Sequence, residues 1–145
     1  MCLNAVKTKE ELDKWLSTQP DVIECYKIVC RRKYTDGTNG YCPWVYSTRK
    51  FCKRNKSIRD ERKLNRTIPI QGFPFYTYVP NFHFYLNKKN AKNIACSDFG
   101  QYVFKCRIKK EDITAIGIQG GCFCIVAKEF EFCSNCFPNK IRIWN

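Results

Sequence analysis

The chain has one histidine, seven glycines and six prolines among 145 residues, and it lacks the common catalytic sequence motifs. With His83 as the only imidazole, a multi-histidine metal site and any mechanism that needs two imidazoles are excluded. The patterns GxxxxGK(S/T), GxGxxG, GxSxG and HExxH do not occur, so P-loop, Rossmann, serine-hydrolase and zincin chemistry lack their usual signatures. We therefore expect no catalytic residues, no metal site and no cofactor.

Long hydrophobic runs are also missing. No stretch approaches the roughly 18 consecutive apolar residues of a membrane span, and residues 1–7 hold no apolar signal-peptide core. We expect a cytoplasmic protein without a membrane partner. Its eleven cysteines are an odd number without a secretion signal, which favours reduced thiols. Zinc binding by Cys133 and Cys136 stays open, since other cysteines would have to complete the ligand set.

Acidic residues are scarce: 26 lysines and arginines face 13 acidic residues, for a net charge of +13. Residues 47–66 contain nine basic and two acidic residues, and residues 88–110 contain seven and one. These two segments account for +7 and +6, so the remaining chain is neutral. A neutral scaffold with two basic segments indicates an anionic partner. We interpret Lys88, Lys89, Lys92, Lys109 and Lys110 as solvated surface.

Residue spacing predicts one α+β domain over residues 1–145, mainly an antiparallel curved sheet with two short helices. Thr8 and Glu11 form a capping box for an N-terminal helix, and Asn87 caps a second helix. Within this domain, residues 47–66 are predicted to form a basic loop or insertion, and residues 133–145 a cysteine-containing tail. The predicted strands are 22–34, 41–46 at a sheet edge because of Pro43, 75–79, 82–86, and a meander of 101–110, 113–118 and 122–132, with a further strand at 141–144. Alternation in 101–110 predicts that Tyr102, Phe104, Cys106 and Ile108 face inward, and Gly120-Gly121 predicts a tight turn.

Aromatic residues interleave with the basic segments, and seven lie between residues 73 and 85. Aromatic rings stack on nucleobases while arginine and lysine neutralise phosphates. Tyrosines suit a pocket because the hydroxyl needs a polar partner. The candidate ligand-binding residues are Lys27, Tyr46, Arg49, Lys50, Tyr76, Tyr78 and His83.

One set of residues is similar to the Arg, Ser-Thr-Ser and Glu-x-Glu elements of ADP-ribosyltransferases. Arg31 or Arg32 lies on the first long strand, Ser47-Thr48 follows the next strand, and Glu129 and Glu131 lie on a late strand. Alternation places the two glutamates on one face of that strand. The resemblance implies an NAD-dependent transferase.

Residues 22–132 resemble small β-rich proteins encoded by bacteriophages and prophages. The resemblance rests on short motifs: Tyr26-Lys27, residues 43–46, Asn81-Phe82-His83-Phe84, Cys106-Arg107-Ile108, residues 112–117 and Ile125-Val126-Ala127. Several proteins of this kind act against host defence, some by sequestering signalling nucleotides. The resemblance implies such a role for this chain, in the host-cell cytoplasm.

These observations lead to one principal hypothesis and two alternatives. The principal hypothesis is non-enzymatic binding of an anionic, nucleotide-type small molecule, with a role in sequestration. The first alternative is a nucleic-acid-binding protein that uses residues 47–66, and the second is an ADP-ribosyltransferase-like enzyme. The sequence leaves the ligand's identity and the oligomeric state open.

Overall fold

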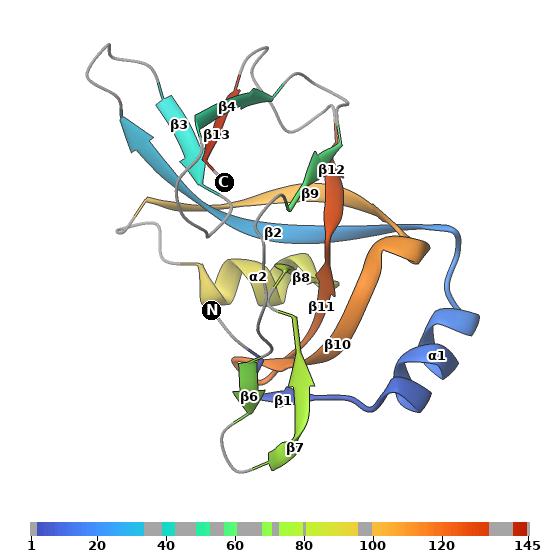
Figure 1. The fold of residues 1–145 in the computed structure, drawn as a ribbon. Coiled ribbons are helices and arrows are strands. Elements are labelled where there is room, and N and C mark those ends of the chain that lie inside the picture. Colours follow the sequence, from blue (N-terminus) through green and yellow to red (C-terminus); the bar gives the residue numbers. More distant parts are fainter. Residues whose placement is uncertain are drawn as a thin grey trace.

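The fold is α+β and consists mostly of one curved, unclosed sheet (Figure 1). The computed structural model describes residues 3–33, 39–42, 49–52, 57–60, 68–70, 73–79, 81–95, 100–133 and 141–144. The elements are β1 (Ala5–Val6), α1 (Lys9–Ser17), β2 (Val22–Lys33), β3 (Asn39–Cys42), β4 (Arg49–Cys52), β5 (Ile58–Arg59), β6 (Ile68–Ile70), β7 (Phe73–Tyr78), β8 (Phe82–Tyr85), α2 (Lys88–Ile94), β9 (Gln101–Lys109), a 3₁₀ turn (Lys110–Asp112), β10 (Ile113–Gln119), β11 (Cys122–Ala127), β12 (Glu129–Phe132) and β13 (Ile141–Trp144).

The long antiparallel pair of β2 and β9 is the spine of the sheet. Its register runs without a shift from Val22 opposite Lys109 to Cys30 opposite Gln101. Residues 23, 25, 27 and 29 of β2 are buried, so the odd-numbered residues form the core face of this strand. Even-numbered residues lie on the opposite face, because successive residues of a strand alternate.

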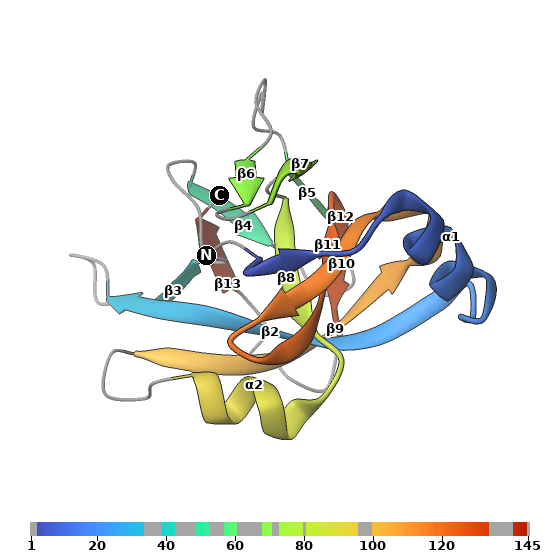
Figure 2. The same ribbon diagram turned by 90° about the horizontal axis from the view of Figure 1, so that it is seen from below.

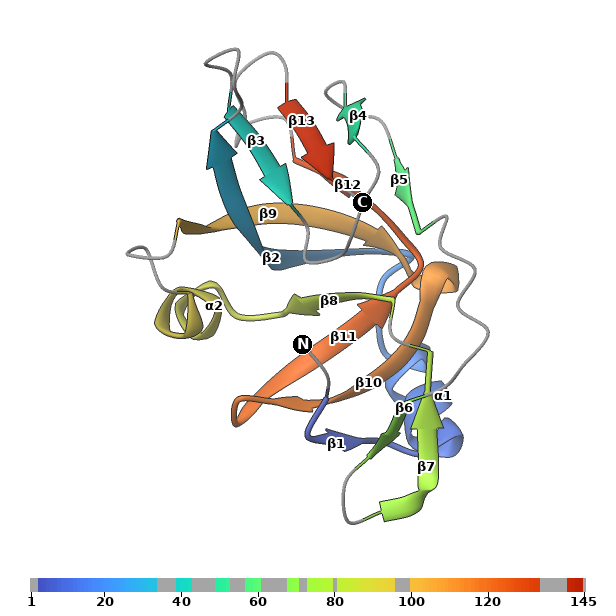
Figure 3. The same cartoon turned by 60° about the vertical axis from the view of Figure 1, so that its left-hand side comes forward.

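Two groups of strands extend from the other edge of β2. Near the middle of β2, Tyr26 pairs with Tyr85 of β8, and the order continues through β11 and β10 to β1. From Cys30 onward β2 pairs with β3, which pairs in parallel with β13, which pairs with β4. Figure 3 shows β3 and β13 standing beside the end of β2. The sheet therefore divides into two arms that share one spine.

The two helices cover different parts of the sheet. Thr8 caps α1 as predicted, with its hydroxyl 3.2 Å from the backbone N–H of Glu11, and Trp15 of α1 packs against Phe123 at a ring-centroid distance of 5.4 Å. Asn87 caps α2, accepting hydrogen bonds from two backbone amides. Figure 2 shows α2 alongside β2 and β9, where its Ala91 joins a buried cluster with Ile28 and Tyr85.

The main core lies on the face of the spine opposite α2. It combines aliphatic residues of β2, β9 and β10 with four phenylalanines. Phe82, Phe84 and Phe132 each place their ring about 5 Å from the ring of Phe130, edge to face. This edge-to-face geometry is the favoured arrangement of aromatic pairs, so β8 and β12 are joined through one residue.

The structure corrects four details of the predicted topology. The strand that contains Tyr41 is not at an edge, because the C-terminal strand β13 pairs with its outer side. Residues 101–132 do not form a meander: β9 pairs with β2 and β12, whereas β10 pairs with β1 and β11. Residues 122–132 form two strands separated at Lys128. Tyr102, predicted to face inward, is 38% exposed.

The predicted basic loop and the predicted C-terminal tail both contain strands. Residues 47–66 include β4 and β5, and the predicted C-terminal tail includes β13. Both short strands of the basic segment pair with strands from the C-terminal part of the chain: β4 with β13, and β5 with β12. Long-range pairing therefore holds part of the basic segment against the sheet.

Candidate ligand-binding surface

Four adjacent strand segments carry several basic residues and no acidic residue. We call them the basic wing, and they comprise residues 30–33 of β2 with β3 (Asn39–Cys42), β13 (Ile141–Trp144) and β4 (Arg49–Cys52). Their six basic residues come from three distant parts of the sequence: Arg31, Arg32, Lys33, Arg49, Lys50 and Arg142. The wing therefore concentrates positive charge that is dispersed along the chain.

The register of the wing sorts these residues between its two faces. Arg32 is opposite Gly40, Gly40 is opposite Arg142, and Arg142 is opposite Phe51. Directly paired residues share a face of the sheet, and so do residues two positions apart on one strand. Trp144 and its partner Arg49 consequently belong to the same face as Arg142.

The face that holds these arginines is the one opposite the core face. The pairing of β2 with β9, and further along with β3, has no register shift. Arg32 therefore lies on the same face as the other even-numbered residues of β2, opposite the core face. We call this set of residues the arginine face, and it consists of Arg32, Arg49, Arg142, Phe51 and Trp144. The remaining basic residues, Arg31, Lys33 and Lys50, belong to the opposite face of the wing, together with Tyr41.

Three of the predicted ligand residues lie together: Lys27 and Tyr78 are buried, and His83 is half-buried. Lys27 is 1% exposed, and its Nζ donates a hydrogen bond to the backbone carbonyl of His83 at 3.0 Å. The same ammonium lies 4.9 Å from the ring centroid of Phe84 and 5.5 Å from that of Phe82. Such distances allow cation–π attraction, which stabilises a desolvated charge.

Tyr78 continues this internal network towards the N-terminal strand. Its hydroxyl lies 3.1 Å from Nε2 of His83 and accepts a hydrogen bond of 2.7 Å from the backbone N–H of Leu3. With 5% of its surface exposed, the Tyr78 side chain is packed among residues of a second, smaller core cluster. The observed contacts of Tyr78 tie β7, β8 and the chain before β1 together.

The other predicted ligand residues divide between the wing and segments without described side chains. Arg49 belongs to the arginine face, whereas its neighbour Lys50 belongs to the opposite face because adjacent strand residues alternate. Tyr76 lies on β7, and Tyr46 lies outside the described residues. The structure therefore does not gather the seven predicted residues into one site.

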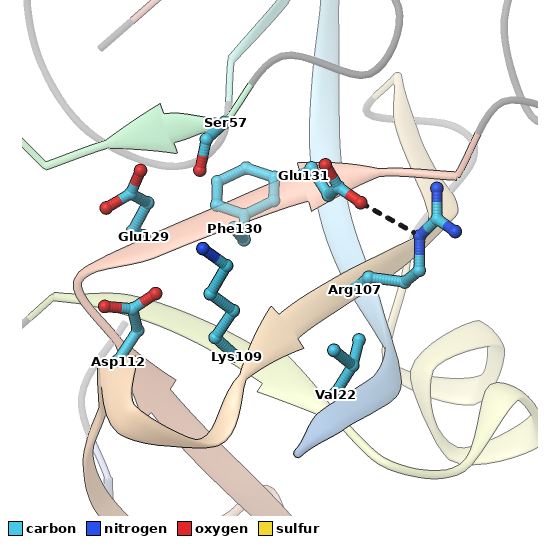
Figure 4. A pocket seen from close by; sticks show the side chains of 8 residues that line it. All are labelled: Val22, Ser57, Arg107, Lys109, Asp112, Glu129, Phe130 and Glu131. Atoms are coloured by element: carbon cyan, nitrogen blue, oxygen red, sulfur yellow. Dashed lines mark ion pairs between the residues drawn. The ribbon is translucent and has the colours of Figure 1, made fainter.

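A hollow of about 210 Å³ opens beside β12 and the end of β9 (Figure 4). Both glutamates of the Glu-x-Glu element line it, as alternation predicts, and Glu131 forms an ion pair with Arg107 at 3.1 Å. Asp112 and Lys109 also line the hollow. Partial burial raises the pKa of the Asp112 carboxyl, and the negative charge of Glu129 raises it further. The hollow has mixed charge and is distinct from the arginine face.

The register also separates the elements that resemble an ADP-ribosyltransferase. Glu131 is opposite Arg107, which is opposite Glu24 on β2. Arg31 lies seven residues further along β2, which corresponds to about 23 Å at ~3.3 Å per residue. Ser47 and Thr48 lie outside the described residues. Arg31 and Glu131 therefore lie near different ends of β2, and the arginine and Glu-x-Glu elements are not brought together.

Two of the buried thiols, Cys25 and Cys124, are poor nucleophiles. Burial raises the pKa of Cys25 well above its usual value and raises that of Cys124 to about 12. Lys27 opposes both shifts through its positive charge, but burial has the larger effect. Among the described residues no group of three or more His, Cys, Asp or Glu side chains could hold a metal ion. Cys136 lies outside them.

The predicted ligand residues include Arg49 of the arginine face but not Arg142, Phe51 or Trp144. The Ile-Arg-Ile-Trp stretch was visible as a strand, yet its parallel pairing with β3 joins residues about a hundred positions apart. A weak signal was available, because Arg142 and Trp144 have the spacing of residues on one face of a strand. Only the pairing with β4 places Arg49 beside them.

Comparison with protein-family models, with curated proteins and with solved structures finds no match for this chain. No helix in the described part of the chain is long and apolar enough to cross a membrane.

Proposed function

We propose that the chain is a non-enzymatic binding protein for an anionic ligand of nucleotide type, held at the arginine face. The observation that carries this proposal is the register that gathers Arg32, Arg49 and Arg142 on one face of strands without an acidic residue. Guanidinium groups bind phosphates through paired, charge-assisted hydrogen bonds, and aromatic rings stack on bases.

Binding fits the described residues better than catalysis. The only histidine contacts Tyr78, and burial raises the pKa of both Cys25 and Cys124. Glu131 is paired with Arg107 at the hollow. Acid–base or nucleophilic catalysis needs an activated group near the ligand. Asp112, a carboxyl with a raised pKa, lines the hollow and not the arginine face. The resemblance to small phage proteins suggests sequestration of a host signalling nucleotide as the biological use of such a site.

Isothermal titration with ATP, ADP-ribose and a cyclic dinucleotide tests the proposal, with a labelled oligonucleotide as a fourth probe. The test variant is R32Q/R49Q/R142Q. The matched control is K88Q/K89Q/K92Q, which removes the same charge from three exposed lysines of α2. We expect the arginine variant to weaken binding of at least one probe by tenfold or more, on the order of one charged hydrogen bond. The lysine variant should bind nearly as the natural chain does.

Two results would contradict the proposal. One is the absence of binding to all four probes by a folded natural chain. The other is equal weakening in the two triple variants, which would mean that only total charge matters. Circular dichroism and thermal unfolding of each variant separate lost binding from lost folding.

A further inference from the structure

The positive charge of the arginine face is spread over several strands. Arg32 and Arg142 are separated by two strand spacings, or about 10 Å, at ~4.8 Å per spacing. Arg49 lies on the strand next to Arg142 and is two residues further along the strand direction, which gives a diagonal distance of about 8 Å between the two positions. The three positions therefore span about 16 Å of sheet. The phosphates of a mononucleotide, by contrast, are contiguous at one end of the molecule.

Aromatic residues alternate with these arginines in the register. Phe51 is the direct partner of Arg142, and Trp144 is the direct partner of Arg49. The pair of β13 and β4 therefore contains two positions at which an arginine is directly opposite an aromatic residue. Phosphate and base alternate in the same way along an unpaired nucleic acid strand, which proteins bind with cationic grooves and stacking rings.

We propose that the arginine face binds single-stranded nucleic acid, with phosphates at the arginines and bases stacked on Phe51 and Trp144. This inference rests on the proposed function, because it assigns a polymeric ligand to the same face. Single strands are favoured over duplexes because stacking on a protein ring needs an unstacked base.

Fluorescence anisotropy with labelled oligo(U) and oligo(dT) of two, four, eight and twelve nucleotides tests this inference, with a duplex 12-mer and ATP as comparison probes. We expect affinity to rise at least tenfold between two and eight nucleotides and to be weaker for the duplex. Binding through three phosphates predicts a slope of about −2 for log K against log salt concentration. In R32Q/R49Q/R142Q that slope should approach zero.

Two further variants keep the test independent of net charge. R32K/R49K/R142K retains the charge but loses the planar fork of each arginine, so we expect weaker binding with a similar salt slope. W144A should weaken single-strand binding at least fivefold while leaving the salt slope unchanged, because stacking is not ionic. K88Q/K89Q/K92Q is the control for non-specific charge.

The outcomes separate this inference from the proposed function. Arginine-dependent binding of ATP or another short nucleotide without any gain with length would overturn the inference and keep the proposed function. Tighter binding to the duplex than to the single strand, or an unchanged affinity in W144A, would also overturn it. Failure of every probe to bind a folded chain would end both proposals.

Discussion

The two buried tyrosines Tyr78 and Tyr85 differ in what their hydroxyl groups contact. Tyr78 accepts the backbone N–H of Leu3 and contacts His83. The hydroxyl of Tyr85 is buried without a hydrogen-bond partner among the described residues, and burial raises its pKa. Replacing each tyrosine by phenylalanine therefore tests whether the hydroxyl contacts of Tyr78 stabilise the fold, with Tyr85 as the comparison.

We expect Tyr78→Phe to lower the free energy of unfolding by about 1–3 kcal/mol, because it leaves the buried Leu3 amide without its acceptor. Tyr85→Phe should change stability by less than about 0.5 kcal/mol or increase it, since no described contact is lost. Urea unfolding of both variants measures the difference. Equal effects of the two substitutions would show that the Leu3 and His83 contacts contribute little.

Asp112 makes stability depend on pH in a defined direction. Its pKa is raised by partial burial and by Glu129 and Glu111, while Lys128 and Lys109 oppose the shift. The native state therefore holds this proton more tightly than the unfolded chain, and its contribution to stability is lost as pH rises above the ordinary value of 3.8. Relative to the natural chain, Asp112→Asn should gain stability between pH 4 and pH 7.

Urea unfolding of both proteins across that pH range gives the difference between their free energies of unfolding. The contributions of carboxyl groups that both proteins share cancel in this difference. A difference that stays constant with pH would contradict the assignment. A difference that falls as pH rises would mean that the folded pKa is lowered instead of raised.

At the scale of elements, the edge strand β1 depends on a glycine in its neighbour β10. A methyl group at Gly117 would run into the carbonyl oxygen of Ala5 and the side chain of Leu3. Backbone hydrogen bonds hold β1 on both sides of this point: the Asn4 amide donates to Ile118 at 2.7 Å and the Lys7 amide to Ile116 at 2.9 Å. The close approach explains why residue 117 has no side chain.

Gly117→Ala should displace β1 and cost about 1–3 kcal/mol, as overpacking does. Hydrogen exchange measured by NMR should show faster exchange at the Asn4 and Lys7 amides, while the amides of β9 keep their protection. Uniform loss of protection throughout the sheet would instead mean that β1 is required for the whole fold. Unchanged exchange at both amides would mean that the backbone moves to accommodate the methyl group.

Local patterns in the sequence were sufficient for most individual elements. The Thr8 and Asn87 caps and the tight turn at Gly120–Gly121 are encoded by neighbouring residues, and all three are present. Pairing is not local. Nothing near residue 101 indicates that β9 bonds to β2 instead of β10, because that choice depends on burying Ile23 against Ile108 and Cys25 against Cys106.

The same limit applies to the candidate site. Tyr78 and His83 are both predicted as ligand residues, and in the structure the Tyr78 hydroxyl contacts His83 within the fold. Arg49 and Arg142 are brought onto one face by a register that neither segment specifies alone. Adjacent basic residues such as Arg49 and Lys50 also look equivalent in sequence until a strand assigns them to opposite faces.

At the scale of the whole molecule, the curved sheet separates a buried, thiol-containing core from the basic wing. Cys25 and Cys106 are opposite each other on β2 and β9, and Cys124 lies on β11. All three are 0% exposed, whereas Cys122 and Cys133 are partly exposed. The three buried thiols therefore report on opening of both the spine and the arm that contains β8 and β11.

Alkylation requires that the thiol is deprotonated and that the reagent can reach it. Burial of Cys25 and Cys124 raises the pKa of each thiol and also blocks access. We expect the three buried cysteines to react with iodoacetamide only through global unfolding, on the order of a thousandfold more slowly than Cys122 for a domain of ordinary stability. Pulsed labelling followed by peptide mass spectrometry measures each rate.

In increasing urea the alkylation rates of the three buried cysteines should rise together along the global unfolding curve, because the three residues lie in one cooperative sheet. Cys124 reacting well before Cys25 and Cys106 would instead show that the arm opens independently of the spine.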